Sequence, residues 1–429
     1  MCTFSSLFLS PLPSIQSTRL LFQPAIVALE WTSQANSLIS YSASSPPIQP
    51  SRPAHRERDI PDVPALLRFL QDSPSVAEHI RILDLTGGMD QMPEYSASIE
   101  PEVFLGLLRV LPNVEDVKLG IATLAGYGSR MEEHEDDDGV CDVDFTSIDE
   151  KAEVIVGSGR RLKSLQIGRT AIEGANACFT LLQFLRTIES LDTLHVFSLS
   201  SRADKKRIVS IRDYCSTLAL PSRLGIQKFV CSFQSAVSVV FMETIRLAPP
   251  HTLRHLDLSY STTPYFENKT WYIQDCLNHV GAGLDTLSLF LTGNQSESLD
   301  LSSCVSLQVI HFTHDIALRS PDNLLLCTNA MLAALSTLPY IPVKLSIKFG
   351  YFTHPTAMLA KHIQILSNLE WKKLVEIVGS HPCREKKLTI MCWGSRGYVV
   401  HDGIVQLVRE KLANLDTKGC LEVVCEYVP

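Results

Sequence analysis

The chain has 429 residues, of which 45 % are hydrophobic and 20 % are charged, so it can build a large folded core and wholesale disorder is excluded. Its formal net charge of −8 argues against a general nucleic-acid binder, because such proteins need a basic surface to displace counterions from phosphates. No uncharged apolar run reaches the roughly 20 residues of a membrane-spanning helix, and the amino terminus lacks a signal peptide's basic segment. We therefore expect no membrane partner and a cytoplasmic or nuclear location.

Residues 1–60 differ from the rest of the chain. The stretch from Ser40 to Pro53 is rich in serine and proline and predicts an extended linker, so we expect 1–60 to be poorly ordered. Within this region, Ala25 to Leu29 together with Trp31 predict one short helix. From Pro61 onward the pattern changes, since a helical period of apolar residues alternates with short strand-like segments.

The helical segments place apolar residues three and four positions apart, which gives each helix one apolar stripe that its neighbours must cover. In chain order these segments are 65–70, 103–108, 179–188, 271–280, 330–338 and 374–378.

The strand-like segments repeat the pattern L-x-x-L-x-L, where L is any apolar residue, and self-similarity at this spacing indicates stacked repeats. The full copies are Ile80/Leu83/Leu85, Val114/Val117/Leu119, Leu162/Leu165/Ile167, Leu191/Leu194/Val196, Ile226/Phe229/Cys231, Leu253/Leu256/Leu258, Leu284/Leu287/Leu289 and Leu307/Ile310/Phe312. Two weaker copies keep only the last two positions, at Leu345/Ile347 and Leu388/Ile390. A terminal strand is expected from Leu421 to Val424.

Helices that alternate with short strands predict parallel strands joined by right-handed crossovers, which is the α/β class. Stacked in sequence order, residues 61–429 predict an irregular leucine-rich-repeat-like solenoid of about ten units. A curved parallel sheet would form its concave face and the helices its convex face.

The residue between the last two apolar positions of each copy should point away from the core, toward solvent on the inner face. These residues are Asp84, Lys118, Gln166, His195, Val230, Asp257, Ser288, His311, Ser346 and Thr389, and nine of the ten are polar. A buried parallel sheet is usually apolar on both faces, so this pattern favours an open solenoid. We expect partner contacts at His195, Asp257 and His311, extended by Asp84, Lys118, Gln166 and Ser288.

The repeats resemble the leucine-rich-repeat portion of the fungal F-box/leucine-rich-repeat-like protein family. The resemblance is carried by residues 66–74, 79–85, 108–114 and 252–258, and as architecture it covers about residues 61 to 425. It implies a substrate-recruiting subunit of an SCF-type ubiquitin ligase, whose F-box would dock on the Skp1 adaptor of the cullin complex. Residues 1–60 show no F-box motif, so a stand-alone scaffold or inhibitor protein is the alternative. In either case we expect a monomer outside its complex.

The sequence contains no complete motif for catalysis or for binding a metal or cofactor. An acidic loop near 131–144 lacks the ligand spacing of an EF-hand. The histidine pairs His251/His255 and His311/His314 have no third zinc ligand in the pattern, and the twelve cysteines include no C-x-x-C pair. No nucleophile elbow or phosphate-binding loop occurs. The sequence thus predicts a binding protein with no metal and no cofactor, and an enzyme is the most distant alternative.

Overall fold

The computed structural model describes residues 25–31, 63–87, 98–99, 101–120, 123–124, 160–168, 171–172, 185, 188–197, 200–201, 224–231, 241–242, 244–246, 248–258, 269–290, 299–315, 321–351, 363–364, 366–379, 387–394 and 402–427. The chain divides into two compact units. The amino-terminal unit contains residues 1–191 and 198–211, and the carboxyl-terminal unit contains residues 192–197 and 212–429. Strand β8 (Ile188–Phe197) contributes residues to both units.

The main sheet of the amino-terminal unit is parallel and follows chain order. Its strands are β1 (Ala25–Trp31), β2 (Ile80–Gly87), β4 (Asp116–Gly120) and β6 (Arg160–Gly168). A second, smaller sheet pairs the two-residue strands β3 (Ser98–Ile99), β5 (Thr123–Leu124), β7 (Ala171–Ile172) and β9 (Ser200–Ser201).

Three helices belong to the amino-terminal unit: α1 (Val63–Asp72), α2 (Pro74–Ala77) and α3 (Pro101–Val110). Helix α1 buries Val63, Leu66 and Leu70, a spacing that places all three on one helical stripe. Helices α1 and α3 contact each other, and Gly106 lies where they meet. A Cβ at Gly106 would stand 2.8 Å from a methyl carbon of Leu67, so the missing side chain permits this close approach.

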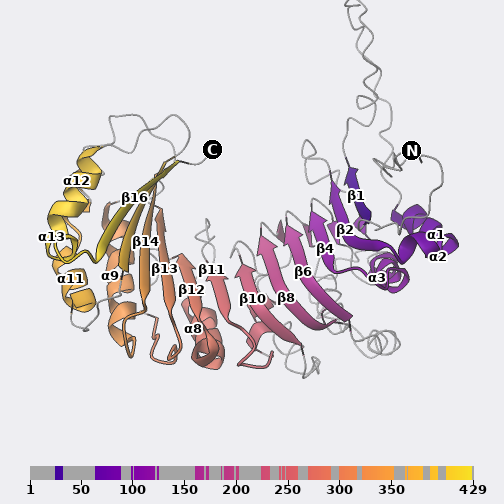
Figure 1. Ribbon diagram of the computed structural model, residues 1–429, viewed down its shortest axis with the longest axis horizontal. Helices are drawn as coiled ribbons and strands as arrows, with labels where there is room; N and C mark the ends of the chain where they lie inside the picture. Colours follow the sequence, from indigo (N-terminus) through magenta and orange to yellow (C-terminus); the bar gives the residue numbers. More distant parts are fainter. Residues whose placement is uncertain are drawn as a thin grey trace, which may run out of the picture. The chain divides into compact units, whose positions relative to one another are not determined.

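The sheet of the carboxyl-terminal unit is also parallel, and its strands lie side by side in chain order (Figure 1). These strands are β10 (Gly225–Cys231), β11 (His255–Leu258), β12 (Thr286–Phe290), β13 (Val309–Asp315), β14 (Lys344–Tyr351), β15 (Lys387–Gly394) and β16 (Leu421–Tyr427). Strand β10 is linked to β8 by a hydrogen bond that Gln227 donates from Nε2 to Asp192 Oδ1 over 3.4 Å. The fold class is therefore α/β with parallel strands.

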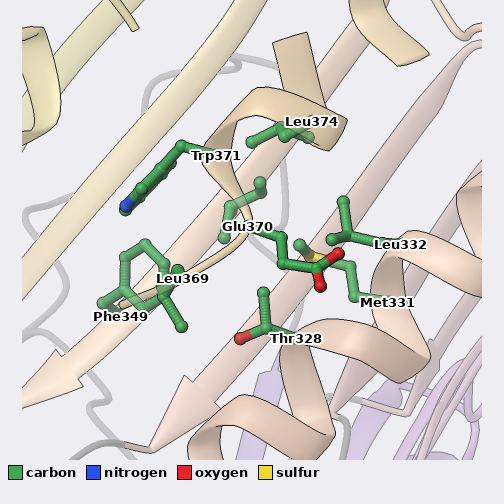
Figure 2. Close-up of a pocket in the computed structure, with 9 residues that line it drawn as sticks. Thr328, Met331, Leu332, Phe349, Leu369, Glu370, Trp371 and Leu374 are labelled. Carbon is green, nitrogen blue, oxygen red and sulfur yellow. The ribbon is translucent and has the colours of Figure 1, made fainter. Parts of the chain in front are cut away.

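The helices of the carboxyl-terminal unit cover one face of its sheet. They are α8 (Lys269–Val280), the short 3-10 helix η2 (Gly281–Gly283), α9 (Pro321–Thr337), α11 (Trp371–Gly379), α12 (Asp402–Lys411) and α13 (Ala413–Asp416). Side chains of α9 and α11 meet Ile347 and Phe349 of β14 around a small apolar hollow (Figure 2). After α13, Gly419 turns the chain into β16 with φ of 68°, a conformation that side chains disfavour.

The predicted strand positions form the core of both units. Every apolar position of the eight full and two weaker copies is buried, with an exposed fraction of at most 4 %. Neighbouring copies also pair in register, as in Leu83↔Val117↔Leu165 and Leu287↔Ile310↔Leu345. The prediction that apolar residues of successive copies stack on one another is confirmed within each unit.

Other predictions about single elements have mixed outcomes. The helix expected at Ala25 to Trp31 is wrong, because this segment is β1, which pairs with β2 and forms the edge of the sheet. The helices expected at 65–70, 103–108, 271–280 and 374–378 are confirmed, and α9 begins nine residues before the predicted start at Ala330. Ile188 starts β8 rather than ending a helix. The acidic loop near 131–144 and residues 1–24 and 32–60 lie outside the described residues.

Candidate protein-binding face

The sheet face opposite the helices carries polar side chains in rows. Successive strand residues point to opposite faces, so residues two apart on one strand share a face. In the carboxyl-terminal unit, residues paired across neighbouring strands form rows that run across the sheet. The middle row consists of Val230, Asp257, Ser288, His311, Ser346, Thr389 and Glu422. The row two residues earlier holds Lys228, His255, Thr286, Val309, Lys344 and Lys387, and the row two residues later holds Phe290, Thr313, Lys348, Met391 and Val424. These three rows, together with His195 of β8, are called the polar face below.

The predicted contact residues are placed as follows. Asp257, Ser288 and His311 lie in the middle row of the polar face, and Asp84, Lys118 and Gln166 form a separate in-register row in the amino-terminal unit. All are half-buried except Ser288, whose residue is only 6 % exposed. The expectation that Ser288 faces solvent is therefore wrong, because this short side chain shares its strand face with the larger Thr286 and Phe290. The same holds for two middle-row residues with longer neighbours, Ser346 and Thr389, which are 1 % and 4 % exposed.

The row in the amino-terminal unit is electrically balanced. Lys118 donates from Nζ to Asp84 Oδ2 over 3.1 Å, directly across the paired strands. Because the Lys118 side chain is 43 % exposed, this ion pair contributes at most about 1 kcal/mol to stability. Gln166 follows as a neutral residue. A partner would therefore find hydrogen-bonding groups on this row and little net charge.

The polar face carries an excess of positive charge, in contrast to the negative chain as a whole. It contains four lysines, Lys228, Lys344, Lys348 and Lys387, against the carboxylates of Asp257 and Glu422.

Glu422 is already engaged by its own strand neighbours. Its Oε2 accepts a hydrogen bond from Lys387 over 2.9 Å and another from Thr389 over 3.2 Å. The Lys387 bond is the main cause that lowers the pKa of Glu422. Within the described residues, neither Lys228 nor Lys344 forms an ion pair, so the excess positive charge lies on the part of the polar face around β10 to β14.

Three histidines lie within this electropositive region. Burial is the largest cause that lowers the pKa of His195, His255 and His311. Lys228 lowers the pKa of the first two further, while Asp257 raises the pKa of all three. Lys344, Lys348 and His255 also lower the pKa of His311. Folded-state pKa values below the ordinary value of about 6.5 mean that the neutral histidines' contribution to stability is present above that pH and is lost as the pH falls through the folded-state pKa.

The middle row contains the residue types of a catalytic triad, but in an order that cannot act as one. Asp257, Ser288 and His311 are register neighbours on β11, β12 and β13, with the serine in the centre. A triad needs the histidine between the serine and the aspartate, so that it accepts the hydroxyl proton and is held by the carboxylate. In the described part of the chain, no hydrogen bond joins Ser288 to His311, and Ser288 is buried. This row does not assemble an activated nucleophile.

The histidine pair His311 and His314 is divided between the two faces of the sheet. Residues three apart on a strand point in opposite directions, so His311 lies on the polar face and His314 lies in the core. His314 is 1 % exposed, stacks on Phe349 with ring centroids 5.6 Å apart, and has Nε2 3.4 Å from the sulfur of Met331. Within the described ranges, no group of three or more His, Cys, Asp or Glu residues has a geometry that could hold a metal ion.

The hollow between α9, α11 and β14 belongs to the core. Its lining is apolar except for Thr328 and Glu370 (Figure 2). The Thr328 hydroxyl donates to the Leu324 carbonyl over 2.8 Å within α9, and Glu370 is exposed. Because no set of polar groups converges on this hollow, it lacks the features that orient a small ligand.

Four of the described cysteines are core residues. Cys231, Cys276, Cys304 and Cys327 are buried, whereas Cys420 is half-buried. Burial raises the pKa of the Cys304 thiol to about 11, which leaves it protonated and unreactive near neutral pH.

Comparison with known proteins adds no family. No protein-family model matches the chain, and no curated protein is similar enough to match it. No helix among the described residues is both long and apolar enough to cross a membrane.

The sequence prediction missed the two rows on either side of the middle row because it took only one residue from each strand. Lys228, His255, Lys344 and Lys348 lie two positions before or after a middle-row residue and therefore share its face. The period of two that selected the middle row would also have selected these four residues.

Proposed function

We propose that this chain is a non-catalytic protein-binding module, built as an irregular leucine-rich-repeat-like solenoid with the polar face on its concave side. One observation carries the proposal. The apolar positions of the L-x-x-L-x-L copies, called anchors below, are all buried on one face of the sheet. On the other face the strands hold polar residues in register. A partner that meets such a face finds side chains already ordered by the sheet, which reduces the entropy lost on binding.

The composition of the polar face also fits a protein partner. Lysines, histidines and hydroxyl residues are interspersed with the apolar residues Val230, Phe290, Val309 and Met391. Protein interfaces combine apolar contacts with hydrogen-bonding groups in this way, whereas an interface for nucleic acid is much more strongly basic. The catalytic alternative has no support from the middle row, where the serine separates the histidine from the aspartate.

Membership of an SCF-type ubiquitin ligase is the more specific form of this proposal. It rests on the resemblance of the repeats to the fungal F-box/leucine-rich-repeat-like family, and it requires association with Skp1 in the cytoplasm or nucleus. A stand-alone scaffold or inhibitor with the same binding face requires no such association. Skp1 co-purification with the intact chain separates the two forms.

The test of the binding module is a pull-down with a triple variant, His195→Ala, Asp257→Ala and His311→Ala. We expect the triple variant to lose the partners that the unchanged chain recovers, because three ordered contacts are removed from the polar face. The melting temperature should stay nearly unchanged, since substitutions of this kind outside the core usually alter stability by about 0.5 kcal/mol or less each.

The matched control changes three exposed charges on helices of the covered side, Lys372→Ala, Glu376→Ala and Asp416→Ala. This control should keep full partner recovery. If the polar-face triple variant recovers the same partners as the unchanged chain, the polar face is not the contact surface and the proposed function fails.

A further inference from the structure

We propose that the polar face binds an acidic segment of its partner, a stretch of chain rich in aspartate and glutamate that lies across strands β10 to β14. The inference rests on the proposed function and gives the chemistry of the partner. It begins from charge complementarity, since the face offers lysines and histidines on a chain whose net charge is −8.

We place the centre of the contact on β14, at Lys344, Ser346 and Lys348. These alternate residues of the strand share one face of the sheet. His311 of β13 is the register neighbour of Ser346. Two lysines, one serine and one histidine therefore converge on a patch two strands wide. The positive charges of both lysines lower the pKa of His311.

Ser346 supplies a second, independent observation. Its residue is 1 % exposed, and its Oγ is buried without a hydrogen-bond partner among the described residues. A buried hydroxyl without a partner costs free energy that a native structure usually avoids. A carboxylate that enters between the flexible ends of Lys344 and Lys348 would accept a hydrogen bond from this hydroxyl and a charge-assisted bond from each lysine.

The dimensions of the face fit a short extended peptide. Lys228 and Lys344 are four strand steps apart in one row, which is about 19 Å at the usual spacing of about 4.8 Å between strands. An extended chain rises about 3.3 Å per residue, so a segment of about six to eight residues reaches from one lysine to the other. The apolar Val309 lies between them in the same row and would meet an apolar residue of the segment.

A protein segment fits this face better than a nucleic acid does. The three rows contain no arginine, and Asp257 lies in the middle row among the histidines. A single carboxylate can be bypassed by a peptide whose acidic residues are spaced apart, or it can accept a hydrogen bond from the peptide. A phosphate backbone carries one charge on every nucleotide and offers no such choice.

The test is fluorescence anisotropy of a fluorescein-labelled dodecapeptide of alternating glutamate and serine, added to the full chain at low salt. Replacing both lysines, Lys344→Glu with Lys348→Glu, should weaken binding about thirtyfold, the effect of losing about 1 kcal/mol at each of two partly exposed sites. The variant Lys344→Arg with Lys348→Arg retains the charges and should bind within about twofold of the unchanged chain. The matched control Lys372→Glu with Lys373→Glu makes the same charge change on the exposed surface of α11 and should leave binding unaffected.

The pH dependence gives a second readout that a folding defect would not reproduce. As the pH falls from 7.5 toward the lowered pKa values of His195, His255 and His311, these side chains take up protons; their neighbours on the face are Lys228, Asp257, Lys344 and Lys348. Binding of the acidic peptide should tighten over this range, because bound carboxylates favour the protonated histidines. The variant His311→Gln should show a smaller gain.

Several outcomes would overturn the inference. They are equal weakening by the α11 control, binding that does not tighten with acid, or equally tight binding of an eight-residue oligothymidylate. If the triple variant at His195, Asp257 and His311 loses its partner while the acidic peptide does not bind, the acidic segment is refuted and the binding module stands. If the triple variant keeps its partner, the proposed function itself has failed.

Discussion

Replacing Phe312 with alanine should lower the free energy of unfolding by about 3–5 kcal/mol, the usual cost of removing a large buried aromatic ring. Phe312 is fully buried in β13, and its register neighbours are Leu289 of β12 and Ile347 of β14. All three belong to the row of last anchors, so the cavity would open inside the continuous core of the carboxyl-terminal unit. Urea unfolding followed by circular dichroism measures the loss.

The control for this variant is the next residue of the same strand. Thr313 is half-buried and lies on the polar face, because adjacent strand residues point to opposite sides. Thr313→Ala should cost less than about 1 kcal/mol. Equal losses for the two variants would mean that the two faces of the sheet do not differ in burial, and the assignment of core and polar face would be wrong.

Replacing Trp371 with alanine should also cost about 3–5 kcal/mol, because this side chain fixes helix α11 on the sheet. Trp371 is 5 % exposed and packs edge-on against Phe349 of β14 with ring centroids 6.3 Å apart (Figure 2). Its indole Nε1 donates a hydrogen bond to the Leu366 carbonyl over 2.6 Å. The variant therefore loses both apolar contact and the hydrogen bond at the start of the helix.

Trp371→Phe separates these two contributions. The phenyl ring retains an aromatic contact with Phe349 and removes the donor to Leu366, so we expect a smaller loss of about 1–3 kcal/mol. Thermal unfolding of both variants in parallel checks the order of the losses. A phenylalanine variant as unstable as the alanine variant would show that the ring contact with Phe349 contributes nothing measurable.

The buried strand positions of the core could be predicted from the sequence, because each L-x-x-L-x-L copy lies within a few consecutive residues. Leu284, Leu287 and Leu289 identify a strand with one buried face without reference to any distant residue, and all three are buried. Pairing in chain order then follows from the crossover rule for parallel strands, and the register of β11 with β12 and of β12 with β13 agrees with it.

What the sequence could not predict depends on contacts between distant segments. Residues Ala25–Trp31 become a strand because β2 offers them an unpaired edge, and nothing within 25–31 identifies that edge. The burial of Ser288 depends on the length of its neighbours on the same face of the sheet. The division of the chain near β8 likewise follows from contact density rather than from a break in the repeat pattern.

The positive charge of the polar face could not be predicted from the sequence either. Lys344 and Lys348 are unremarkable in sequence, and only the register brings them beside His311. The net charge is a property of the whole chain, so it does not indicate that lysines are concentrated on one face.

The most direct test of the account is lysine acetylation, followed by mass spectrometry, on the chain alone and in the complex that it recovers in the pull-down. Lys228, Lys344 and Lys348 should react in the free chain and become protected in the complex, while Lys372 and Lys373 on α11 should react equally in both. Protection of the two α11 lysines with continued reactivity on the polar face would place the partner on the helices and contradict the account.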